Sequence, residues 1–147
     1  MSRHCRTALV LLATALALTA CGRLYELPPP QGEPVLLERA DFITTWTDAD
    51  DGTVTLKPDG TFVAHDICVA VSWDEGLAWS GTGTWRQKAN KEQSFLRLRF
   101  DDDHPEASDQ RPDSYSAIKS GNVLKLWTRV GDPDHDHPHC TLTRPAP

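Results

Sequence analysis

The residues with the clearest potential for chemistry lie near the C-terminus, in the stretch GDPDHDHPHC from Gly131 to Cys140. Imidazole nitrogens are ligands for zinc and copper, and a histidine three residues before Cys68 could join them from a second segment. The ligands of such a site would be His65, His135, His137 and His139. The sequence therefore allows an extracytoplasmic transition-metal site built from two segments.

A turn between two strands is the other interpretation of the same stretch, and the preferred one. Asp, Pro and Gly are turn residues, so the histidines would fill an exposed loop tip. Successive strand residues point to opposite faces, which leaves His139 and Cys140 poorly placed to bind one ion. A cysteine in a disulfide is also no thiolate ligand. Metal binding is thus the alternative hypothesis, and no cofactor is expected.

The N-terminus is typical of an exported protein. MSRHCR carries two arginines and no acid, and the apolar run from Thr7 to Ala20 is shorter than the roughly 20 residues that span a bilayer as a helix. Leu-Thr-Ala before Cys21 resembles the lipobox of bacterial lipoproteins, which implies a diacylglyceryl group on Cys21 and cleavage after residue 20. An ordinary signal peptide with an incidental cysteine is the alternative.

These features predict three regions. Residues 1–20 would be the lipoprotein signal peptide, residues 21–34 a lipidated cysteine and proline-rich tether, and residues 35–147 the folded domain. Two acyl chains (the palmitate type of anchor) hold a protein stably on a membrane. We therefore expect the protein on the extracytoplasmic face of the cell membrane.

Charge and cysteine content narrow the possible partners. Without residues 1–20 the chain has 13 rather than 15 Lys and Arg residues against 21 Asp and Glu, a net charge of −8, which disfavours nucleic acid. Loss of Cys5 and acylation of Cys21 leave Cys68 and Cys140, which we expect to form a disulfide in an oxidising compartment. A monomer is expected.

Strand patterns occupy the region after Ile43. Thr53–Leu56 and Thr61–His65 alternate around the turn KPDG, and Trp79–Gln87 places Trp79, Gly81, Gly83 and Trp85 on one face. Further strands are expected at 43–47, 95–100, 115–119, 123–130 and 140–144, with at most a helical turn or two in 34–42. About eight short antiparallel strands favour an up-and-down barrel, because closure removes unpaired edges.

The stretches ITTWTDADDGTVTLKPDGTF, SGTGTW and GDPD resemble small actinobacterial lipoproteins of unknown function whose domain is similar to lipocalin barrels. The resemblance covers most of residues 42–144. It implies a lipocalin-like all-β barrel in which Trp46 takes the place of the signature tryptophan that closes the barrel bottom. Thr44 stands where that signature has glycine. The resemblance implies no established activity.

The remaining candidates are aromatic. Trp73 and Trp79 flank the expected barrel mouth and are the candidates for contact with a ligand or partner. Catalytic signatures such as G-x-S-x-G, H-E-x-x-H and a phosphate-binding glycine loop are missing, so we do not expect an enzyme. The sequence predicts a membrane-anchored, non-catalytic binding barrel whose partner is a small apolar ligand or a protein.

Overall fold

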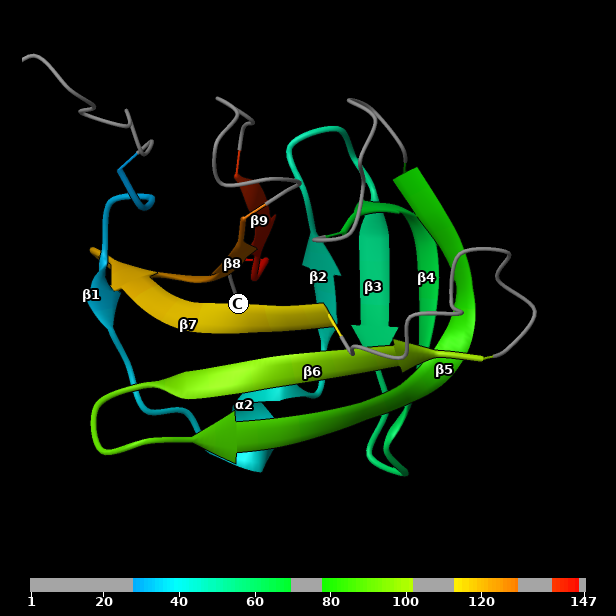
Figure 1. The fold of residues 1–147 in the computed structure, drawn as a ribbon, viewed down its shortest axis with the longest axis horizontal. Helices are drawn as coiled ribbons and strands as arrows, with labels where there is room; N and C mark the ends of the chain where they lie inside the picture. The colour runs from blue at the N-terminus through cyan, green and yellow to red at the C-terminus, as the bar shows by residue number, and fades with distance from the viewer. Residues whose placement is uncertain (1–27, 70–77, 102–112, 130–138, 146–147) are drawn as a thin grey trace, which may run out of the picture.

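The computed structural model describes residues 28–69, 78–101, 113–129 and 139–145, and the predicted signal peptide and the first half of the tether lie outside them. Nine strands and one short helix make up this part of the chain (Figure 1). Their bounds are β1 Glu33–Pro34, α2 Arg39–Phe42, β2 Thr45–Thr47, β3 Thr53–Leu56, β4 Thr61–Cys68, β5 Ala78–Ala89, β6 Ser94–Phe100, β7 Asp113–Ser120, β8 Val123–Thr128 and β9 Cys140–Thr143.

The strands form a closed, antiparallel up-and-down barrel, as predicted. Each strand from β2 to β8 pairs with the next one along the chain, and the pair Thr47↔Thr143 joins β2 to β9 and closes the ring of eight. β1 is an additional strand, which pairs with the end of β7 through Glu33↔Lys119 and Pro34↔Ile118. In Figure 1, β6 and β7 run roughly horizontally across the view, whereas β2, β3 and β4 run roughly vertically.

The alternation in the sequence places one face of each strand in the core. On β5, Trp79, Gly83 and Trp85 are buried, and on β6, Leu96 and Leu98 are buried. Gly83 is required where it stands, because a Cβ atom there would collide with the carbonyl of Arg99 and the ring of Phe62. The two strands can therefore pass close together over a bulky aromatic core.

The predicted turns are also present. The amide of Gly60 donates to the carbonyl of Lys57 at 3.1 Å, and Gly60 has a φ of 87°, which glycine adopts without strain. The hydroxyl of Thr61 donates to Asp59 at 2.7 Å, and this hydrogen bond is the main reason that the pKa of Asp59 is lowered. Gly121, with a φ of 60°, turns the chain between β7 and β8.

The helix α2 closes one end of the barrel. It lies at the same end as the β3–β4 turn (Figure 1). Its last residue, Phe42, is fully buried between Trp46 and Trp85, with ring centroids 6.5 and 6.2 Å away. The indole N–H of Trp46 donates to the carbonyl of Phe42 at 3.0 Å, and Arg39 stacks on the Trp85 ring at 4.2 Å. The four-residue helix thus acts as an aromatic plug.

Candidate functional site

The two ends of the barrel differ. Short turns at 57–60, 90–93 and 121–122 lie at the end that α2 plugs. Hairpin connections alternate between the ends of an up-and-down barrel, so the connections β2–β3, β4–β5, β6–β7 and β8–β9 all belong to the other end, which we call the loop end. The predicted site residues Trp79, Cys68, Cys140 and His139 belong to this end. Trp73, His135 and His137 lie outside the described residues.

The predicted disulfide between Cys68 and Cys140 is confirmed, with Cα atoms 5.5 Å apart. It joins β4 to β9, although β2 and β3 lie between these strands in the barrel order. The last residue pair between β3 and β4 is Thr53↔His65. β4 continues beyond this pair to Cys68, past the short β2–β3 hairpin. The bridge therefore spans the gap above that hairpin, beside a barrel seam that consists of one residue pair.

A single carboxylate organises the backbone beneath the disulfide. Asp48 Oδ1 accepts the amides of Asp50 at 3.0 Å and Gly52 at 2.7 Å, while Oδ2 accepts the amide of Cys68 at 3.0 Å. A Cβ atom on Gly52 would collide with the carbonyl of Asp66. Asp48 therefore has a structural task, which is to fix the β2–β3 turn against the end of β4.

His139 lies at the start of β9 and is partly buried. Its Nε2 atom lies 3.0 Å from the carbonyl oxygen of Pro28, so Nε2 must carry the proton that is donated, and its ring centroid is 5.1 Å from that of Trp127. Nδ1 is buried and has no hydrogen-bond partner among the residues described. Burial, and to a lesser extent the charge of Arg129, lowers the pKa of His139. These contacts fasten the N-terminal segment to the barrel.

The metal hypothesis gains no support from the residues that can be placed. His65 is exposed on β4, opposite Thr53, and the sulfur atoms of Cys68 and Cys140 are bonded to each other. No group of three His, Cys, Asp or Glu side chains within the described ranges could hold an ion. The hypothesis stays a prediction that depends on His135 and His137.

Trp79 is buried near the loop end rather than displayed on its surface. Only 7% of it is exposed, and its ring packs edge-on against Phe100 at 5.6 Å. Trp79 pairs with Ile67 across the register shift that separates Ala64 from Ile67 on β4. Contact between Trp79 and a ligand stays a prediction, and in this structure its ring contributes to the core.

A row of cations on the outside of β5 and β6 has no motif that marks it in the sequence. Arg86 and Lys88 alternate with buried or half-buried residues on β5, as Arg97 and Arg99 do on β6. We call these four residues the basic face. The alternation alone puts each arginine outside, but the strand register is needed to show that Arg86 lies directly opposite Arg97.

Comparisons with protein-family models, with curated proteins and with solved structures find no match in any of the three. No helix among the described residues is long and apolar enough to cross a bilayer.

Proposed function

We propose that this protein is a membrane-anchored, extracytoplasmic binding module that contacts a macromolecular partner with the outside of its barrel and catalyses no reaction. The observation that carries the proposal is the filling of the barrel interior by the protein's own side chains. Trp46, Phe62, Trp85, Leu98 and Tyr115 are each at most 2% exposed. Barrels of about eight strands are either filled in this way or hold one small ligand. A filled interior leaves the outer surface as the place for a partner.

Three polar groups of the described region that could serve catalysis make structural hydrogen bonds instead. Asp48 fixes the β2–β3 turn, and Asp41 caps α2 by accepting the amide of Glu38 at 2.9 Å. The hydroxyl of Tyr115 donates to the carbonyl of Cys68 at 2.8 Å. Such arrangements support a scaffold with fixed geometry more than a site with reactive groups.

The proposed anchor is consistent with the path of the N-terminal segment. The described chain begins at Pro28, whose carbonyl is bonded to His139, and continues into β1. Pro28 is seven positions after Cys21, so the spacer can reach about 25 Å when fully extended. The barrel would then stay closer to the membrane than a free tether of residues 21–34 would allow.

Membrane fractionation of cells that express the full chain tests the anchor. We expect the wild-type protein to stay with membranes after an alkaline carbonate wash. We also expect a protease added to spheroplasts to digest the protein, because it would lie on the outer face of the membrane. Cys21→Ser should abolish membrane retention of the mature protein, whereas Cys5→Ser, in the segment that is cleaved off, should change nothing. Equal retention of the wild type and Cys21→Ser would contradict the lipid anchor.

Binding of small apolar molecules tests the filled interior. Titration of a fluorescent fatty acid into the detergent-extracted protein should give no saturable change in tryptophan fluorescence, because Trp46 and Trp85 already occupy the interior. Stoichiometric binding that quenches these tryptophans would favour a small-ligand carrier instead.

A further inference from the structure

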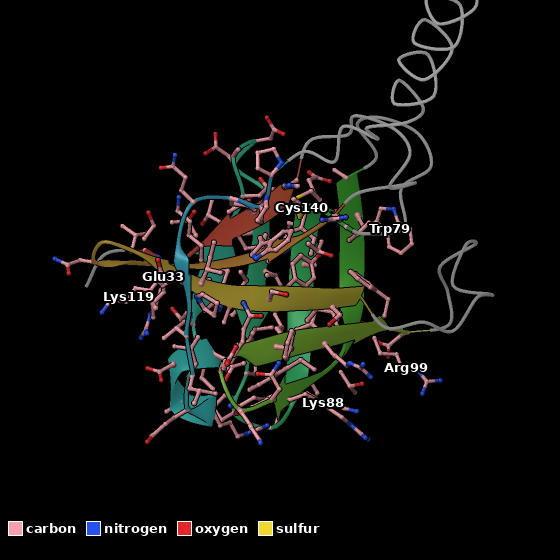
Figure 2. All side chains as sticks on the ribbon, turned by 60° about the vertical axis from the view of Figure 1, so that its left-hand side comes forward. Glu33, Trp79, Lys88, Arg99, Lys119 and Cys140 are labelled. Carbon is pink, nitrogen blue, oxygen red and sulfur yellow. A yellow bond between two sulfur atoms is a disulfide. The ribbon has the colours of Figure 1, made fainter. Side chains whose placement is uncertain are left out.

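The four side chains of the basic face form a continuous row of positive charge. Arg99 and Arg97 are two residues apart on β6, Arg97 lies directly opposite Arg86, and Lys88 is two residues beyond Arg86 on β5. Neither strand contains an acidic residue. Figure 2 shows Lys88 and Arg99 extending away from the barrel on the same side, far from Glu33 and Lys119. In a chain with more acids than bases, this face has the opposite sign to the whole.

The cations of this face lack partners within the described structure. The ion pair identified there joins Arg144 to Asp41, and none of the four side chains makes a hydrogen bond or ion pair with another described residue. Asp101, the acid that directly follows β6 in the chain, instead accepts a hydrogen bond from the hydroxyl of Thr82 at 2.7 Å. Like charges directly opposite each other destabilise a strand pair, so the repulsion between Arg86 and Arg97 lowers the stability of the barrel. An anion between them would remove that repulsion.

The face also points away from the membrane if the anchor is at Cys21. The chain leaves the barrel beside β9, where Pro28 meets His139. In the closed order of eight strands, β5 is four strands from β9 in either direction. The basic face is therefore on the opposite side of the barrel from the exit toward the membrane. This geometry favours a partner in the space beyond the membrane over the lipid headgroups.

The spacing of the charges matches one chemical class of polymer. Cations two residues apart on a strand are separated by six backbone bonds, or about 7 Å. In a polymer of glycerol phosphate, successive phosphorus atoms are also separated by six bonds and can lie at a similar distance. Guanidinium groups bind phosphate oxygens in a bidentate way, which suits three arginines in file.

We propose that the basic face binds an extended poly(glycerol phosphate)-type polymer of the cell envelope, with successive phosphates on Arg99, on the opposed pair Arg97 and Arg86, and on Lys88. The inference rests on the proposed function, because it names the partner class of that external surface and takes the side of the anchor from it. Binding releases counterions from the polymer, so the affinity falls as salt rises.

Fluorescence anisotropy of a labelled poly(glycerol phosphate) of about ten units tests the inference, with the full chain held in neutral detergent micelles. Three phosphate contacts give a slope of about −2 in a plot of log K against log salt concentration. Arg86→Gln/Arg97→Gln should weaken binding about tenfold or more at low salt and make the slope shallower by about 0.7, because the pair holds one phosphate. Lys119→Gln/Lys125→Gln removes the same charge from β7 and β8 and should leave both values nearly unchanged.

Several results would overturn the inference. These are absence of saturable binding at low salt, equal losses in the two double variants, or tighter binding of the wild type to single-stranded DNA of equal length. Tighter binding to phosphatidylglycerol vesicles through Arg86 and Arg97 would assign the face to the membrane instead. If polymer binding fails while Cys21 is lipidated, only this inference fails. If Cys21 is unmodified while the polymer binds, the anchor fails and the basic face stands.

Discussion

Removal of the disulfide between Cys68 and Cys140 should cost the barrel a large part of its stability. The bridge links residues 72 positions apart and spans the gap above the β2–β3 hairpin. In the chain-entropy treatment, a closed loop of this length contributes about 4 kcal/mol by restricting the unfolded chain. The single residue pair between β2 and β9 offers little to replace it, so we expect nearly the full effect.

Urea denaturation of Cys68→Ala/Cys140→Ala, followed by tryptophan fluorescence, measures this loss. Cys5 and Cys21 are replaced by serine in every protein compared, so that other thiols do not interfere. A decrease of about 4 kcal/mol in the free energy of unfolding is expected, and reduction of the bridged protein should reproduce it. A loss below about 1 kcal/mol would refute the argument, because the strand pairing alone would then close the barrel.

Three further predictions concern other parts of the fold. Gly52→Ala should lower the free energy of unfolding by about 2 kcal/mol in urea titrations, since its Cβ meets the Asp66 carbonyl, and a neutral result would contradict the close packing of the turn. Phe42→Ala should cost about 3–5 kcal/mol by the same measurement, because it removes the aromatic plug; a loss under about 1 kcal/mol would show that α2 is dispensable. Burial lowers the pKa of His139 from its usual 6.5, so the unfolded chain binds the proton more readily and stability rises with pH up to that value. His139→Gln should flatten the rise below about pH 6.5, and an unchanged slope would count against the buried histidine.

The alternating strands and their turns could be predicted from the sequence, because each depends on residues that are close together in the chain. Trp79–Gln87 alternates with period two, and KPDG and Ser-Gly-Asn have turn chemistry, so β5 and the two turns follow directly. Sequential hairpins then leave an up-and-down barrel as a favoured arrangement. The role of α2 could not be predicted. A segment of four residues is too short to have a pattern that indicates the packing of Phe42 between two distant tryptophans.

The candidate site was predictable only in part. The disulfide followed from a count of cysteines in a chain that we expect to be exported, without knowledge of the fold. Contacts that depend on register or on distant segments did not follow. These include the hydrogen bonds of Asp48 to Cys68 and of His139 to Pro28, and the placement of Arg86 opposite Arg97. No local pattern specifies which residues meet across a closing seam.

Intact-mass spectrometry of the protein recovered from the membranes of a bacterial host tests the anchored barrel most directly. We predict a chain that begins at Cys21 and carries a diacylglyceryl group, with two hydrogens fewer than the reduced form because Cys68 and Cys140 are joined. A chain that begins elsewhere, or that has an unmodified sulfur at Cys21, would contradict it.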